Sequence, residues 1–141
     1  MHIKFHTRQL ILFSPKSIAQ LKELTLIGES QMRTAIDTGS PNNIAITAKL
    51  NNKLIAWCLV QKRHRHPRRH HAIVQVFVAP DYRRNGIGAK LIVRATNYIK
   101  RCGSFKEITC APWNTDSKMF FKTTGFSSKN KSKIWSKNVK V

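Results

Sequence analysis

The fold of this chain is decided by the stretch Val76-Phe77-Val78-Ala79-Pro80-Asp81-Tyr82-Arg83-Arg84-Asn85-Gly86-Ile87-Gly88-Ala89-Lys90-Leu91. An apolar run ends at Pro80, a basic turn with two glycines follows, and an apolar-periodic segment then extends from Ile87 to about Cys102. This order of segments predicts a strand, a glycine loop and a helix.

The glycine loop is suited to an anion. Gly86 and Gly88 allow backbone N–H groups to approach a bulky ligand, and the first N–H groups of the following helix attract phosphate oxygens. Arg83 and Arg84 add positive charge, so a phosphate or pyrophosphate is expected. Two common nucleotide loops do not fit, because a Rossmann loop needs a third glycine where this chain has Leu91, and no Gly-Lys-Ser/Thr of a Walker loop follows.

Periodicity along the rest of the chain predicts further strands and helices. Ser14-Pro15 is a typical helix start, Asn51-Asn52 a typical hairpin turn, and Gly125 a typical helix end. The expected strands are 2–6, 43–50, 53–61, 71–79, 105–111 and 133–139, the last paired with residues near Phe126. The expected helices are 15–27, 29–36, 87–102 and 114–124.

Two motifs resemble those of one known family. Arg83-x-x-Gly86-x-Gly88, preceded by Val78-x-Pro80-x-Tyr82, is similar to the acetyl-CoA-binding motif of the GCN5-related N-acetyltransferases (GNAT). The family's second motif, in which an asparagine starts a helix and a Phe-Tyr pair precedes Gly-Phe, resembles Asn114-x-x-Ser117-x-x-Phe120-Phe121-x-x-x-Gly125-Phe126. The resemblance covers about residues 1 to 139. It implies an α/β (α+β) fold, a GNAT-like mixed and twisted β-sheet of about six to seven strands flanked by about four helices, in one domain over residues 1–141.

The resemblance also assigns residues to acetyl-CoA, the expected co-substrate. Backbone groups of Val76, Phe77 and Val78 should pair with the pantetheine arm, and one N–H there should polarise the thioester carbonyl. The pyrophosphate should be held by Arg83, Arg84, Asn85, Gly86, Ile87, Gly88 and Ala89. The second motif completes the expected cofactor-binding set with Asn114, Ser117 and Phe121.

The catalytic groups depart from the family pattern. Phe121 stands where the family usually has a tyrosine that protonates the leaving thiolate, and phenylalanine has no donor. Ala72 occupies the position where many members carry a glutamate base. The candidate catalytic residues are His71, which titrates in a useful range, and Gln75, which has the groups to hold a water.

Three cysteines, Cys58, Cys102 and Cys110, fit neither a disulfide framework nor a zinc site, because their number is odd and their spacing irregular. We expect reduced, mostly buried thiols. A covalent acyl-cysteine route through Cys110, which ends a strand beside the expected cleft, is the alternative.

Charge is the unusual property of the chain. Its 26 Lys and Arg residues face 6 acidic residues, which gives a formal net charge of +20. Such a field attracts polyanions, so RNA, a ribonucleoprotein or an acidic protein is the candidate partner. The alternative is a general basic bias of the surface added to a cofactor site that itself needs positive charge.

Two segments concentrate this charge. The loop Lys62-Arg63-His64-Arg65-His66-Pro67-Arg68-Arg69-His70-His71 is interpreted as a protruding basic hairpin that contacts phosphates, or as a solvated loop. A metal site of its four histidines is a third alternative, but the arginines repel a divalent ion and no metal is expected. The second segment extends from Lys118 onward, and no acidic residue follows Asp116. Trp135 within this segment is either a core residue or a stacking platform. Its lysines are Lys118, Lys122, Lys129, Lys131, Lys133, Lys137 and Lys140.

Length and composition limit the remaining possibilities. With 141 residues and 41% hydrophobic content, the chain is long enough for a single core. No apolar run approaches the length of a membrane span, and Met1-His2-Ile3-Lys4-Phe5 lacks the apolar region of a signal peptide. A cytoplasmic protein, monomeric or homodimeric, is expected.

Two functions are therefore considered. The first is an N-acetyltransferase that moves an acetyl group from acetyl-CoA to a primary amine on a macromolecule, either a protein lysine or N-terminus or an aminoacyl-RNA. The second is a catalytically weak or inactive module of the same fold that binds nucleic acid or an acidic protein through its basic surface. Phe121 and Ala72 favour the second, and the intact Arg83-x-x-Gly86-x-Gly88 favours the first.

Overall fold

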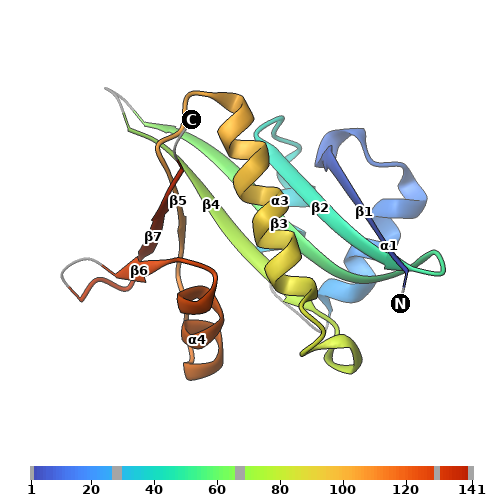
Figure 1. Cartoon of the computed structure of the whole chain (residues 1–141). Helices are drawn as coiled ribbons and strands as arrows, with labels where there is room; N and C mark the ends of the chain where they lie inside the picture. Colours follow the sequence, from blue (N-terminus) through green and yellow to red (C-terminus); the bar gives the residue numbers. More distant parts are fainter. Residues whose placement is uncertain (1, 27–29, 66–68, 129–130, 140–141) are drawn as a thin grey trace.

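The computed structural model describes residues 2–26, 30–65, 69–128 and 131–139, and these form one mixed sheet flanked by helices (Figure 1). The sheet order is β1-β2-β3-β4-β5-β7-β6. The strands are β1 (Ile3–Gln9), β2 (Asn43–Leu50), β3 (Lys53–Arg65), β4 (Arg69–Val78), β5 (Glu107–Cys110), β6 (Ser127–Ser128) and β7 (Trp135–Asn138). The helices are α1 (Pro15–Thr25), α2 (Ser30–Thr38), α3 (Ile87–Cys102) and α4 (Thr115–Thr123), with short 3-10 turns η1 (Leu10–Leu12) and η2 (Pro80–Tyr82).

The first four strands form an antiparallel meander. β2 and β3 are joined by Asn51 and Asn52, whose positive φ angles of 51° and 66° suit a two-residue hairpin turn. β4 then leads through η2 and α3 to β5, which runs parallel to β4 because the helix returns the chain to the same end of the sheet. The mixed sheet expected from the sequence is confirmed.

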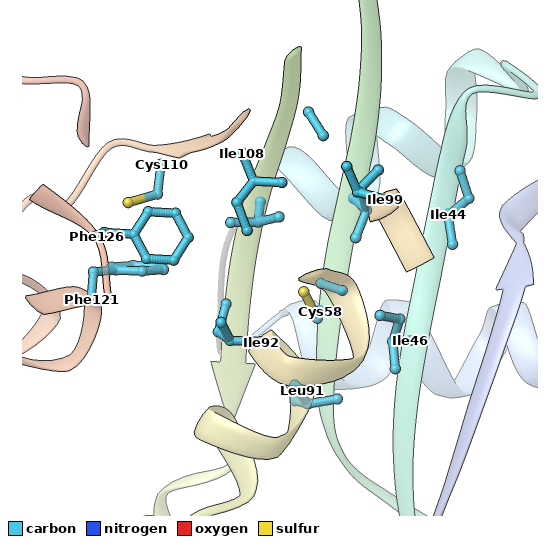
Figure 2. Close-up of a cluster of buried hydrophobic side chains, with 14 of the residues drawn as sticks. Ile44, Ile46, Cys58, Leu91, Ile92, Ile99, Ile108, Cys110, Phe121 and Phe126 are labelled. Atoms are coloured by element: carbon cyan, nitrogen blue, oxygen red, sulfur yellow. The ribbon is translucent and has the colours of Figure 1, made fainter. Parts of the chain in front are cut away.

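Two apolar clusters hold the helices on the sheet. The larger cluster lies under α3 and extends to Phe121 and Phe126 at the C-terminal end of the fold (Figure 2). It includes Ile44, Ile46, Leu91, Ile92, Ile99 and Ile108. The smaller cluster covers the opposite face under α1 and α2, with Leu21, Met32, Trp57, Leu59 and Phe77. Helices and apolar clusters thus cover both faces of the central strands.

Sequence signals explain the helix boundaries. The Ser14 hydroxyl accepts the Ser17 N–H at the start of α1, and Asn114 and Ser117 form a capping box at the start of α4. α3 begins after Gly86 and ends at Gly103, with φ angles of 73° and 74°. Both are left-handed conformations that glycine adopts without strain.

Several predicted boundaries were wrong. β3 and β4 do not stop at residues 61 and 71 but continue to Arg65 and Arg69, which face each other in the register. β1 reaches Gln9 rather than residue 6, because it pairs with β2 over its whole length. The last strand is shorter than the predicted 133–139. It pairs with β5 as well as with β6.

No helix in the described ranges is long and apolar enough to cross a membrane.

Candidate active site

β4 and β5 separate along their length and leave a gap in the sheet. They pair only where His71–Ile73 face Glu107–Thr109, and beyond Ile73 no strand of the described ranges pairs with this edge of β4. Figure 1 shows the two strands diverging toward the start of α3, with α4 on the far side. The sequence-predicted residues Val76, Phe77 and Val78 lie on this open part of β4.

The turn after β4 is held by its own side chains. Arg83 Nε donates a 2.9 Å hydrogen bond to the carbonyl oxygen of Val78, and its guanidinium lies 5.7 Å from the ring centre of Phe77. Asn85 Nδ2 donates to the carbonyl oxygen of Tyr82 at 3.2 Å. The N–H groups of Tyr82 and Arg83 donate to the carbonyl oxygens of Ala79 and Pro80, so the turn up to Arg83 is closed by its own hydrogen bonds.

A run of backbone N–H groups is available at the start of α3. The first hydrogen bond that closes the helix runs from the Lys90 N–H to the carbonyl oxygen of Gly86. Between Arg84 and Ala89, no N–H group has an acceptor in the part of the chain that the structure describes. Arg84 and Gly86 both have positive φ, 67° and 73°, which curves this run into a concave nest. Such a nest at a helix N-terminus attracts an anion.

Gly88 is the point where α3 and α4 approach. A Cβ atom placed on Gly88 would lie 2.8 Å from Phe120 Cε1 and 3.7 Å from Val76 Cγ1. Phe120 of α4 therefore packs directly on the first turn of α3. Phe120 belongs to the second motif, but the motif does not reveal which surface this ring contacts.

The second motif places its aromatic and polar groups in different environments. Phe121 is 7% exposed, and its ring lies 5.0 Å from Phe120 and 5.2 Å from Phe126 in edge-to-face contacts. Figure 2 shows Phe121 beside Phe126 and Cys110. Asn114 Oδ1 accepts the Ser117 N–H at 2.7 Å, and the Ser117 hydroxyl accepts the Asn114 N–H at 3.1 Å. Asn114 and Ser117 thus hold the start of α4, while their role toward a cofactor stays a prediction.

The two candidate catalytic residues lie at different ends of β4. His71, Gln75 and Phe77 share one face of the strand, and Ala72 faces the larger core. His71 lies where β4 pairs with β5, and Gln75 is four residues on, about 13 Å along the strand. Gln75 is therefore the one beside the open edge. Its Oε1 atom is buried and has no hydrogen-bond partner among the described residues, and the same holds for Nε1 of Trp57 on the neighbouring strand.

Cys110 lies at the end of β5 but is a poor nucleophile. Its side chain is 1% exposed, and burial raises the pKa of the Cys110 thiol from 9.0 to about 12. Burial also raises the pKa of Cys58. The expectation of buried thiols is confirmed for these two, whereas Cys102 is half-buried. A neutral thiol at physiological pH does not favour an acyl-cysteine route.

These thiols lead to a prediction. At about pH 8 we expect iodoacetamide to modify Cys102 and to spare Cys58 and Cys110, because only the thiolate reacts. Above pH 9.0 the unfolded thiols ionise while buried Cys110 stays neutral up to about 12, so the free energy of unfolding should fall as pH rises through this interval. Peptide mass spectrometry and urea titrations measure the two effects. Rapid labelling of Cys110 in the folded protein would contradict this prediction.

The basic loop is described only in part. The β3–β4 ladder reaches Arg65 and Arg69, but residues 66–68 and the side chains of His64 and His70 lie outside the described residues. Lys62 Nζ lies 5.9 Å from the ring centre of Tyr98 on α3. Among the side chains that the structure describes, no group of three or more His, Cys, Asp or Glu residues is placed to hold a metal. The alternatives for the loop stay predictions.

Comparisons with known proteins identify the family. The model of the acetyltransferase (GNAT) family matches residues 15–126. Comparison with curated protein sequences gave no match. Among solved structures, the NatC complex bound to Gag peptide and CoA aligns with a TM-score of 0.76 at 15% identity, over 99% of this chain and 100% of that chain.

Two further structures have the same fold. PaiA N-acetyltransferase from Thermoplasma acidophilum in complex with coenzyme A aligns with a TM-score of 0.67 at 15% identity, over 96% of this chain and 99% of that chain. An aminoglycoside acetyltransferase from an uncultured soil metagenomic sample aligns with a TM-score of 0.73 at 17% identity, over 92% of this chain and 91% of that chain. Identities this low concern the fold alone, and the family match over most of the chain carries the assignment. The chain belongs to the GNAT family of acetyl-CoA-dependent acetyltransferases.

Proposed function

We propose that this protein transfers an acetyl group from acetyl-CoA to a primary amine on a macromolecule. The observation that carries the proposal is the run of unbonded N–H groups from Arg84 to Ala89, placed at the end of an unpaired strand edge. A pyrophosphate beside an extended amide-bearing arm is the ligand that fits both features.

Different parts of the chain bind different parts of acetyl-CoA. Backbone N–H groups from Arg84 to Ala89 hold the pyrophosphate, and exposed Arg84 adds positive charge. The open edge of β4 at Val76–Val78 hydrogen-bonds the pantetheine amides as an added strand would. One N–H of this edge polarises the thioester carbonyl, and the thioester supplies the activated acetyl group. Phe120 lines the α4 side of the gap between β4 and β5, next to the first turn of α3.

Proton transfer depends on few groups. The attacking amine must lose a proton, and Gln75, whose buried Oε1 has no partner, orients the water that accepts it. His71 is about 13 Å from Gln75 along β4, which is too far to act on the same atom. Phe121 donates no proton, so the departing sulfur leaves as a thiolate, which a thiol of ordinary pKa near 8.5 tolerates.

Charge favours an anionic macromolecule as the carrier of the amine. A net charge of +20 repels a small polyamine and attracts RNA, a ribonucleoprotein or an acidic protein. One similar structure was solved with a peptide and CoA. We therefore place the acceptor amine on a protein lysine, a protein N-terminus or an aminoacyl-RNA.

A second candidate function is a binding module with little or no turnover. The observation that favours it is Phe121, a buried aromatic residue without a donor at the position of the family's usual acid. In that case the basic surface binds the partner, and the gap between β4 and β5 no longer supports acetyl transfer.

One experiment tests the proposal and separates the two candidates. Acetyl-CoA is titrated into nucleic-acid-free protein by calorimetry, and thiol release is then followed with no acceptor, with bulk RNA, with aminoacylated RNA and with an acidic protein. We expect one acetyl-CoA per chain and thiol release that depends on one acceptor. Binding without release in any mixture would support the module, and absence of binding would overturn the cofactor assignment.

A further inference from the structure

A second concave surface lies between α3 and β1 and shares Ala89 with the nest. This groove has a volume of about 830 Å³. In Figure 1, β1 is the edge strand of the sheet, and β2 runs between it and α3. The groove is lined by Phe5, Thr7, Ala89, Lys90, Val93, Arg94, Asn97, Lys100 and Arg101. We refer to it as the α3–β1 groove.

The α3–β1 groove is strongly basic. Lys90, Arg94, Lys100 and Arg101 contribute four exposed cations, and no Asp or Glu is among the residues that line it. Lys90, Arg94 and Arg101 recur at helical spacing, so they follow one stripe of α3. Like charges held together without an acid repel one another, and an anionic ligand relieves this repulsion.

The groove also offers a stacking surface. The Arg94 guanidinium lies over the Phe5 ring, with its central carbon 4.5 Å from the ring centre, in a cation–π contact. An exposed guanidinium can stack on a base and can donate its N–H groups to a phosphate. Val93, which is 55% exposed, adds apolar surface beside it.

The dimensions suit a polynucleotide. From Lys90 to Arg101 the helix rises about 16 Å. In one strand of a B-form duplex the phosphates are spaced about 3.4 Å along the axis. Even at the wider spacing of an extended single strand, more than one phosphate lies within reach of the stripe. A single small anion would engage only one or two of these cations.

We propose that the α3–β1 groove binds single-stranded RNA, with the α3 cations on phosphates and Arg94 stacked on a base. An acidic protein would use the cations but not the stacking surface. Neutral Thr7 and Asn97 in the same groove have the donors and acceptors that a ribose 2′-hydroxyl needs, which favours RNA over DNA. This site goes beyond the acetyl-transfer proposal, since none of its cations was assigned to acetyl-CoA.

The test compares two variants of equal charge. The groove variant is Arg94→Gln/Lys100→Gln/Arg101→Gln, and the control is Lys16→Gln/Lys22→Gln/Arg33→Gln on exposed positions of α1 and α2. Binding of a fluorescein-labelled oligouridylate of about twelve nucleotides is measured by anisotropy on the full chain at several salt concentrations. In the groove variant we expect binding to weaken about tenfold or more, and the slope of log K against log salt to lose about two units.

The control defines what diffuse charge contributes. It should weaken binding only about two- to threefold, because its cations lie outside the groove. Equal losses in both variants, or no loss in either, would overturn the proposal. So would equal affinity for deoxyuridylate of the same length, or displacement of RNA by polyglutamate at equal charge. Thermal unfolding of both variants checks that each remains folded.

A second readout locates the RNA directly. Photo-crosslinking with 4-thiouridine should attach RNA to the peptides that contain Phe5 and Arg94, and adducts confined to the control surface would contradict the site. Acetyl-CoA calorimetry on the groove variant should match the unmodified protein. If the protein binds RNA through the groove but does not bind acetyl-CoA, the RNA site is supported and the proposed acetyltransferase function is contradicted.

Discussion

Replacing Gly88 by leucine is expected to abolish measurable acetyl-CoA binding and to lower the free energy of unfolding by about 1–3 kcal/mol. A Cβ atom added at this position would lie 2.8 Å from Phe120 Cε1, so the rest of a leucine side chain must push α4 away or fill the space between α3 and α4. Either movement disturbs the N–H nest that starts at Arg84. Calorimetry with acetyl-CoA and urea denaturation measure the two effects.

Two further variants show whether the contact with Phe120 is the cause. Gly88→Ala alone should weaken binding and stability, and Phe120→Leu in the same chain should restore part of both losses, because the smaller side chain leaves room for the new methyl group. Gly103→Asn at the other end of α3 is the control, since it has open space and asparagine tolerates its positive φ. A folded Gly88→Leu variant with unchanged acetyl-CoA affinity would show that the nest is not the cofactor site.

Replacing Trp57 by alanine should lower the free energy of unfolding by about 3–5 kcal/mol. Trp57 is fully buried in the cluster under α1 and α2, and its ring lies 5.9 Å from that of Phe77 on β4. The cavity would remove packing from the strand that carries the open edge, so acetyl-CoA binding should weaken as well. Urea denaturation followed by circular dichroism measures the loss.

Trp57→Phe separates packing from polarity. Trp57 Nε1 is buried without a partner, so phenylalanine removes an unsatisfied donor while it keeps most of the apolar contact. We expect this variant to be far closer to the unmodified protein than Trp57→Ala. Trp113→Ala is the matched control, because Trp113 is 75% exposed and its loss should change stability by about 0.5 kcal/mol or less. Comparable losses for Trp57→Ala and Trp113→Ala would contradict the burial of Trp57.

Local chemistry in the sequence was sufficient to predict most of the fold. The strand, loop and helix around Gly86 and the cap of α4 at Asn114 depend on neighbours within a few residues, and both are confirmed. The extent of β3 and β4 was underestimated because the run of cations and histidines after Gln61 has no apolar alternation. These residues are strand because their backbones pair with each other, as Arg63 does with His71.

The contacts of the site were beyond the sequence. Nothing near Gly88 indicates that Phe120, 32 positions later, would fill the space beside it. The α3–β1 groove likewise joins the N-terminal strand to a helix far away in the chain. The cations of α3 look like an ordinary solvated helix face until β1 is placed beside them. Tertiary packing alone reveals which charges share one surface.

The narrow ladder between β4 and β5 has a consequence for folding. The meander from Asn43 to Val78 closes through hairpins between chain neighbours, whereas β5 joins it through only three residue pairs that are separated by 36 positions. Loop closure over this distance is slower than hairpin formation. We therefore expect the meander to form before the segment from β5 onward, with the nest and the open edge of β4 along the boundary between them. We expect amide protons of β5, α4 and β7 to exchange faster than those of β2 and β3, and a ligand that spans the boundary to slow that exchange.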